Sequence, residues 1–240
     1  MENPPLVKGI PGVPIQERTF AMTEVTSDQP ASQRRKRRDA IENRERILQV
    51  ARQLFATQGV DATSMNEIAQ VARIGPGTLY RCFAHKGVLG EALLTESIAA
   101  FWKQVDATLS PDAPDPALSQ LDWFLDALLR LTETHLSLFT LVMELAGSPH
   151  HREYTNPFYP ALYQRICQLL AKAVAQGETS DLDVAFTADA ILASMMPPLY
   201  EFQRQTRDFS RERIMTGMRR LFIDGLRVYA QHTTAPGNKG

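Results

Sequence analysis

The sequence predicts an all-α protein with a helix-turn-helix near its N-terminus and a larger helical part after it. Apolar residues recur at helical spacing from Ala40 onward, two short capped segments follow one longer amphipathic segment, and no β-alternation persists. With 240 residues, of which 44% are hydrophobic and 22% charged, the chain can bury a sizeable core. No stretch approaches the roughly 18 apolar residues that a membrane-spanning helix requires.

The composition excludes a disordered chain, a collagen-like repeat and a disulfide-rich miniprotein. Cys82 and Cys167 are far apart and lack the spacing of metal ligands, which favours a reducing compartment. The first 20 residues are interrupted by Pro and Gly and do not resemble a signal peptide. We therefore expect a cytoplasmic protein without metal or cofactor.

Charge is distributed unevenly along the chain. Residues 31–90 contain eleven Lys and Arg residues and five Asp and Glu residues, which gives a net charge of +6. Residues 91–240 contain thirteen Lys and Arg residues and eighteen Asp and Glu residues, which gives a net charge of −5. A basic segment joined to an acidic one is typical of a nucleic-acid-binding domain that carries a separate module.

The chain begins with an expected disordered tail, residues 1–39, that is rich in Pro, Gly, Ser and Thr and ends in a basic run. Met22 is an alternative translation start. The run consists of Arg34, Arg35, Lys36, Arg37 and Arg38. Such a run is either a solvated arm or, beside a DNA-binding domain, an arm that reaches phosphates or a minor groove.

Residues 40–90 form the expected DNA-binding domain. A helix from Ala40 is amphipathic and ends at Gly59, where a left-handed cap is favoured. Ser64 and Glu67 have the spacing of a capping box, which predicts the start of a short second helix. Pro76 suits the first turn of a third helix because its missing N–H is not needed there. A long helix and two short ones in this order predict a helix-turn-helix.

Residues 91–232 form a second expected domain, which is helical, followed by a tail over residues 233–240. A fourth helix spans about residues 85–109 and ends at a Pro-rich break. Apolar periodicity then predicts helices near residues 121–131, 138–145 and 158–176, with a polar loop over residues 147–157. A helix over residues 181–207 should kink at Pro197-Pro198, and Ser210 should cap a last helix that extends to Tyr229.

The segment from Thr63 to Phe83 resembles the TetR family of bacterial transcriptional regulators. The resemblance rests on Ala69-x-x-Ala72, Gly77-Thr-Leu-Tyr80 and the pair Phe83 and Lys86 in that order and spacing, over about fifty residues. It implies a bacterial regulator, most often a repressor, that binds a double-stranded DNA operator as a homodimer and responds to a small-molecule effector.

The resemblance also implies roles for individual residues. Thr78, Tyr80 and Lys86 occupy positions that usually contact phosphates. Base contacts usually come from the positions of Asn66, Pro76, Gly77 and Arg81, and only Asn66 and Arg81 carry suitable polar side chains here. The expected DNA-binding set also includes Ser64, Arg73 and the basic run.

Three residues depart from the family pattern. Arg73 stands where the family has a turn glycine, so either a non-glycine residue has a positive φ or the turn differs. Cys82 replaces a common His and removes a phosphate donor. Gly87 and Gly90 weaken the first turns of the fourth helix.

The resemblance implies a ligand pocket between the central helices, and aromatic and Met side chains suit an apolar one. Glu144 lies among apolar residues and is either a buried partner of a cationic ligand or an exposed residue at a helix end. The candidate pocket residues are Trp102, Trp123, Phe124, Phe139, Met143, Glu144 and Tyr163.

Apolar stripes on the last two helices predict a four-helix dimer interface across a two-fold axis. A monomer that buries both stripes internally is the alternative. The candidate interface residues are Leu192, Met196, Leu199, Ile214, Met218, Leu221, Phe222 and Gly225.

Two other functions remain open from the residues alone. A helical metal-dependent enzyme would use His135, Glu144, His150 and His151, but these residues lack the i, i+4 spacing of a helical metal site. A sequence-indifferent architectural DNA binder would rely on the basic run. The favoured interpretation is a non-enzymatic, ligand-responsive repressor.

Overall fold

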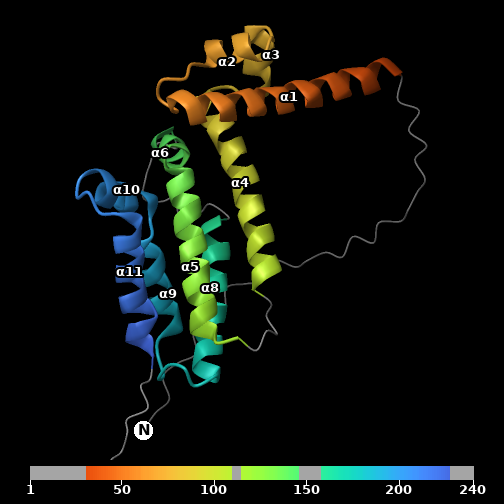
Figure 1. Cartoon of the computed structure of the whole chain (residues 1–240). Helices are drawn as coiled ribbons and strands as arrows, with labels where there is room; N and C mark the ends of the chain where they lie inside the picture. The colour runs from red at the N-terminus through yellow and green to blue at the C-terminus, as the bar shows by residue number, and fades with distance from the viewer. Residues whose placement is uncertain (1–30, 110–114, 146–157, 228–240) are drawn as a thin grey trace, which may run out of the picture. The chain divides into compact units, whose positions relative to one another are not determined.

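The computed structural model describes residues 31–109, 115–145 and 158–227, and its regular elements within these ranges are all helices (Figure 1), which confirms the predicted all-α class. The helices are α1 (Ala31–Gln58), α2 (Met65–Val71), α3 (Pro76–Cys82), α4 (Lys86–Thr108), α5 (Ala117–Thr134), α6 (Leu136–Leu145), α8 (Phe158–Ala175), α9 (Val184–Ser194), α10 (Pro197–Gln205) and α11 (Arg211–Phe222), followed by a 3₁₀ turn (Asp224–Leu226). Residues 1–30 of the expected 1–39 tail, the expected tail over residues 233–240 and the expected loop over residues 147–157 lie outside the described residues.

The chain divides into two compact units, residues 1–40 and residues 41–240. In the first unit, the described residues form the beginning of α1, and this helix starts at Ala31 rather than at Ala40 as expected. The basic run is therefore helical. Arg, Lys, Gln and Ala all have favourable helix propensities, and no Gly or Pro follows Pro30 within this stretch.

In the second unit, the local signals in the sequence act as predicted. Gly59 has a φ of +89° after the end of α1. The Glu67 N–H donates to the Ser64 hydroxyl at 3.1 Å, and the Ser64 N–H donates to the Glu67 carboxylate at 3.5 Å, which completes the capping box. Pro76 is the first residue of α3, and the Ser210 hydroxyl caps α11.

The helix-turn-helix has a hydrophobic core of its own, which we call the HTH cluster. It contains Ile47, Leu48, Ala51, Val60, Ile68, Ala69, Leu79, Phe83, Leu89, Leu93, Leu94, Leu138 and Leu141. The last two belong to α6, so a helix from the second half of the sequence completes this core. The expected domain boundary at residue 90 falls inside α4, whose later residues Phe101 and Val105 belong to a different cluster.

The absence of a side chain at Gly90 allows α6 to pack closely against α4. A Cβ atom at this position would lie 3.0 Å from the Leu141 Cδ2 atom, closer than real Cβ contacts normally come. Glycine therefore weakens the helix locally but allows the two helices to approach.

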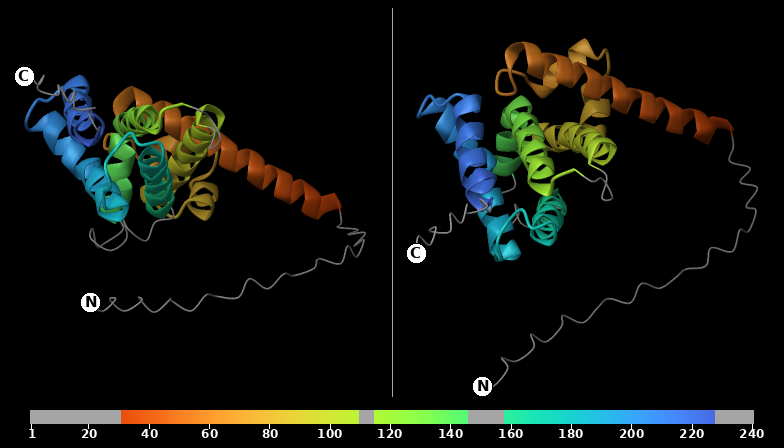
Figure 2. Two further views of the ribbon diagram at one scale, coloured as in Figure 1. Left: turned by 90° about the horizontal axis from the view of Figure 1, so that it is seen from below. Right: turned by 60° about the horizontal axis from the view of Figure 1, so that its bottom comes forward.

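The larger hydrophobic cluster is built around α5, which contributes eight buried apolar residues to it and lies among α4, α8 and α11 (Figures 1 and 2). The expected kink at Pro197-Pro198 is instead a complete break. Helix α9 ends at Ser194, and Pro197 begins α10. Proline provides no N–H to continue the first helix but suits the first turn of the next. The last helix also ends earlier than expected, at Phe222.

The N-terminus of α5 is capped by residues that lie about sixty positions later in the chain. Its cap residue, Pro116, makes no side-chain hydrogen bond. The Ala117 N–H donates to the Glu178 carboxylate and, at 2.9 Å, to the Gln176 side-chain oxygen, and the Leu118 N–H donates to Glu178 at 3.3 Å. An anionic group at a helix N-terminus is favoured by the helix dipole.

We expect Glu178→Ala to lower the free energy of unfolding by about 1–2 kcal/mol, because the substitution removes the acceptor of the Leu118 N–H and one of the two acceptors of the Ala117 N–H. Denaturant titration measures this change. Glu91→Ala is the matched control, because Glu91 is exposed on α4. An equal effect of both substitutions would contradict a capping role for Glu178.

Candidate nucleic-acid interface

Helix α3 presents the predicted recognition residues on its exposed surface. Leu79 is fully buried in the HTH cluster and anchors the helix, whereas Tyr80 is 47% exposed and Arg81 is exposed. Pro76 and Gly77 are also exposed at the start of the helix, and Thr78 is half-buried. A helix that is anchored on one side and carries polar groups on the other can enter a major groove.

Helix α2 contributes Asn66, which is exposed one residue after the helix begins. The hydroxyl of Ser64 accepts the Glu67 N–H within the capping box. Ser64 therefore has a structural role in positioning α2, whatever contact it makes with DNA.

Arg73 forms the turn between α2 and α3 in a left-handed conformation, with a φ of +54°. Its N–H donates to the Gln70 carbonyl at 3.1 Å, and the Ile74 N–H donates to the Ala69 carbonyl at 3.0 Å. This is the Schellman pattern, in which C′ is usually glycine. Of the two alternatives that the sequence left open, the positive φ is thus confirmed. The exposed arginine carries a strain cost of roughly 1–2 kcal/mol.

Lys86 was expected to contact a phosphate, but its ammonium faces the protein. The Nζ atom donates to the carbonyls of Val60 at 2.8 Å, Thr63 at 3.1 Å and Asp61 at 3.4 Å. All three carbonyls belong to the turn between α1 and α2. Lys86 is therefore not positioned as a free cation at the surface.

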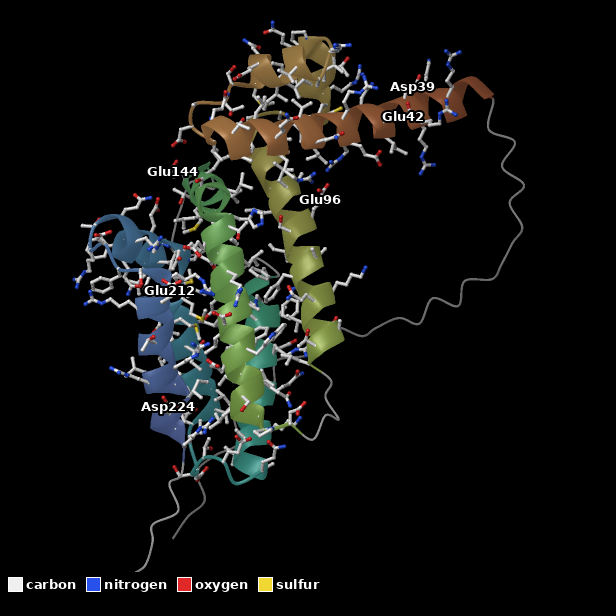
Figure 3. All side chains as sticks on the ribbon, in the orientation of Figure 1. Asp39, Glu42, Glu96, Glu144, Glu212 and Asp224 are labelled. Atoms are coloured by element: carbon white, nitrogen blue, oxygen red, sulfur yellow. The ribbon has the colours of Figure 1, made fainter. Side chains whose placement is uncertain are left out.

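The basic run lies along the first part of α1. Arg35, Lys36, Arg37 and Arg38 are exposed there, and the side chain of Arg34 lies outside the described residues. Asp39 and Glu42 follow on the same helix (Figure 3). Because successive helical residues turn by about 100°, the cations point in several directions and cannot all face one DNA strand.

The seven expected pocket residues do not form one site. Phe124 is fully buried and packs against Phe101 and Trp102, with ring centroids 5.8 and 6.2 Å apart. Phe139 packs against the HTH cluster. Glu144 is exposed at the end of α6 (Figure 3), which rules out the buried carboxylate among the two alternatives. Trp123 and Tyr163 pack on the larger cluster, and Met143 is half-buried.

A groove of about 510 Å³ lies between α4 and α5, and none of the expected pocket residues lines it. Phe101 and Leu131 are the buried apolar residues of its lining. Its polar lining includes Gln104, Asp126, Arg130 and His135. Burial, followed by the positive charge of Arg52, lowers the pKa of His135, which favours the neutral imidazole.

The prediction of a dimer interface is wrong for Leu192, Ile214 and Met218, because these three residues are buried in the core. For these three residues the structure favours the alternative of internal burial. Leu199 and Leu221 are 40% and 66% exposed, Gly225 is exposed, and Met196 and Phe222 are half-buried.

Sequence reasoning missed two exposed aromatic residues, Phe186 on α9 and Phe202 on α10. Phe186 is 71% exposed, more than any other large apolar residue among those described. A helical projection of residues 184–194 separates Phe186 from the buried Ala188 and Ile191, and this signal was available.

The metal-enzyme alternative finds no support in the described ranges. They contain no group of three or more His, Cys, Asp and Glu side chains that could hold a metal ion, and His150 and His151 lie outside them. In the same ranges, no helix is long and apolar enough to cross a membrane.

The fold and the exposed face of α3 define a helix-turn-helix DNA-binding protein. Residues 47–93 match the model of the tetR family of bacterial regulatory proteins. An HTH-type transcriptional regulator of Staphylococcus aureus (strain bovine RF122 / ET3-1) is 30% identical over 188 residues, which cover 78% of this chain and 96% of the relative. The chain belongs to the TetR family of transcriptional regulators.

Solved structures share this fold. A TetR-family regulator from Pectobacterium atrosepticum has a TM-score of 0.62 at 21% identity, with 80% of this chain and 98% of that chain covered. A TetR/AcrR-family regulator from Thermobifida fusca has a TM-score of 0.61 at 22% identity, with 78% and 100% covered. These relatives are regulators, and the chain is a DNA-binding transcriptional regulator rather than an enzyme.

Proposed function

We propose that this regulator is a homodimeric repressor in the bacterial cytoplasm that binds a pseudo-palindromic operator and is released by a small, mainly hydrophobic effector. The observation that carries the dimer is the exposure of four large apolar residues on α9, α10 and α11, which we call the apolar patch. It consists of Phe186, Leu199, Phe202 and Leu221. Large apolar groups exposed to solvent on these helices suit an interaction surface, and their burial would contribute about 25 cal/mol per Å².

A two-fold axis through the apolar patch would give the dimer two copies of α3. Two recognition helices in successive major grooves lie about 34 Å apart along B-DNA, and the operator then repeats the symmetry of the protein. Within each half-site, Thr78 and Tyr80 would contact phosphates, and the cations of α1 would add affinity that depends on salt.

In this proposal, Asn66 and Arg81 carry the direct base readout, because they are the exposed side chains at base-reading positions that can hydrogen-bond to base edges. Arg81→Ala is expected to remove about 1–3 kcal/mol of discrimination at one symmetric pair of operator positions. Selection from a random DNA library measures this preference. Lys103→Ala, which removes an exposed cation from α4 outside the recognition helix, is the control. An unchanged set of selected sequences for Arg81→Ala would instead favour readout of DNA shape.

The groove between α4 and α5 supports the effector proposal. Its lining combines two buried apolar residues, Phe101 and Leu131, with six polar or charged residues, and this mixture suits a molecule that has an apolar part and several polar groups. Helix α4 lines the groove and also contributes to the HTH cluster. A ligand that binds the two conformations of this helix with different affinity would shift DNA binding, and about 1–3 kcal/mol suffices for a 5–150-fold change.

The whole proposal is tested on the full chain by three measurements. Sedimentation gives the oligomeric state, library selection gives the symmetry of the bound DNA, and a screen of hydrophobic compounds tests for a raised melting temperature together with DNA release. A monomer that selects asymmetric DNA would contradict the dimeric repressor. Compounds that raise the melting temperature without releasing DNA would contradict the effector mechanism.

A further inference from the structure

Lys86 is the first residue of α4, and its side chain turns back onto the segment that joins α1 to α2. An ammonium group has three N–H donors, and the Nζ atom of Lys86 has three carbonyl acceptors, on Val60, Asp61 and Thr63, between 2.8 and 3.4 Å. Within the described residues, no backbone N–H donates to these carbonyls. Among the protein groups described, Lys86 is therefore the donor that all three carbonyls share.

The same turn carries a wider polar network. Thr63 is only 1% exposed, and its hydroxyl donates to the Gly59 carbonyl at 2.8 Å. The Gln58 amide donates to the Thr63 hydroxyl at 3.2 Å and to the Glu67 carboxylate at 2.9 Å. Glu67 belongs to the capping box that starts α2. The end of α1, the turn, the start of α2 and the start of α4 are thus joined by hydrogen bonds.

A lysine at this position is electrostatically unfavourable for α4 itself. The N-terminus of a helix carries a partial positive charge, and a cation there costs roughly 0.3–1 kcal/mol. The carbonyls of the turn offset this cost, because each is the negative end of a backbone dipole. To bind a phosphate, the ammonium would have to leave acceptors that have no backbone donor.

We propose that Lys86 is a positioning residue that holds the α1–α2 turn and the start of α2 against the start of α4, and that it does not act as a phosphate ligand. Its three hydrogen bonds fix where α2 begins relative to α4. Because α2 supports the recognition helix, the ammonium acts on DNA binding through the placement of these helices. The inference rests on DNA binding by this chain and does not require the proposed dimer or effector.

The test compares Lys86→Met with Lys103→Met in the full chain. Methionine keeps much of the side-chain length but donates no hydrogen bond, and Lys103 is an exposed lysine on the same helix, away from the turn. Two quantities are measured: amide hydrogen exchange over residues 59–67 without DNA, and affinity for selected DNA as a function of salt, both well below the melting temperature.

We expect Lys86→Met to speed exchange over residues 59–67 and to lower DNA affinity about tenfold, the scale of one lost charge-assisted hydrogen bond. The slope of affinity against salt should stay unchanged. Lys103→Met should change neither exchange nor affinity. Lys86→Arg, which keeps a cationic donor, should restore most of the affinity. If Lys86→Met does not fold, Lys86→Gln, which retains two donors, replaces it with a smaller expected loss.

Two results would overturn the proposal. A fall of about 0.9 in the salt slope with unchanged exchange would identify Lys86 as a phosphate ligand. If amide exchange over residues 59–67 became faster in Lys86→Met while DNA affinity stayed the same, Lys86 would contribute to stability but not to DNA binding. The exchange measurement uses no DNA, so a failure of the proposed dimer or operator would not be mistaken for either outcome.

Discussion

Leu221→Glu is expected to convert the proposed dimer into monomers and to lower operator affinity by a hundredfold or more, roughly the gain that linking two half-sites provides. Leu221 is 66% exposed on α11, beside the buried Ile214 and Met218 that hold this helix to its own subunit. In a two-fold interface each substitution appears twice. Two carboxylates would lose their hydration together, which costs several kcal/mol.

Thr216→Glu is the matched control for this substitution. Thr216 is exposed on the same helix, and five residues of helical rotation place it about 140° around the axis from Leu221. Sedimentation and gel-shift titration measure the two expected changes. A Leu221→Glu protein that remains dimeric with normal operator affinity would exclude the apolar patch as the interface.

Gly90→Val is expected to lower the free energy of unfolding by about 2–3 kcal/mol, because overpacking a close helix contact forces backbone shifts. The first added carbon would lie 3.0 Å from Leu141 Cδ2 and 3.7 Å from Leu138 Cδ2. Both leucines belong to the HTH cluster, so displacing α6 also loosens the DNA-binding fold. We therefore expect DNA affinity to fall together with stability.

Gly77→Ala gives the contrasting result in the same denaturant titration. A Cβ atom at Gly77 meets nothing within 4 Å, so alanine should stabilise α3 by about 0.4–1 kcal/mol. The two substitutions are therefore expected to change the free energy of unfolding in opposite directions. If Gly90→Val were as harmless as Gly77→Ala, the contact between α4 and α6 would not be tightly packed.

The elements of the helix-turn-helix were readable from the sequence because their signals are local. Gly59 ends α1, the Ser64 and Glu67 pair starts α2, and Pro76 starts α3, each through groups within one helical turn. The start of α1 was misjudged because a run of like charges was interpreted as disorder, although its residues favour helix. At Pro197-Pro198 the sequence predicted a kink, but the structure has a break between α9 and α10.

The sequence predicted those residues of the candidate site whose exposure follows from their position on a single helix. Tyr80 and Arg81 are exposed on α3 as the motif indicated. Lys86 is different, since its role depends on carbonyls 23 to 26 positions earlier in the chain, and no spacing rule connects them. Similarly, Ile214 and Leu221 belong to one stripe in the sequence, yet one is buried and the other exposed.

The sequence by itself determined the helical class, most helix ends and which residues of α3 are exposed, because helix periodicity and caps arise from residues at most a few positions apart. Only the tertiary structure decided that α6 completes the HTH cluster, that Glu178 caps α5 and that Lys86 faces a turn of the backbone. These contacts join segments from 23 to 61 residues apart. Many pairings of amphipathic helices satisfy the same apolar pattern, and the one adopted is set by how all of the side chains pack together.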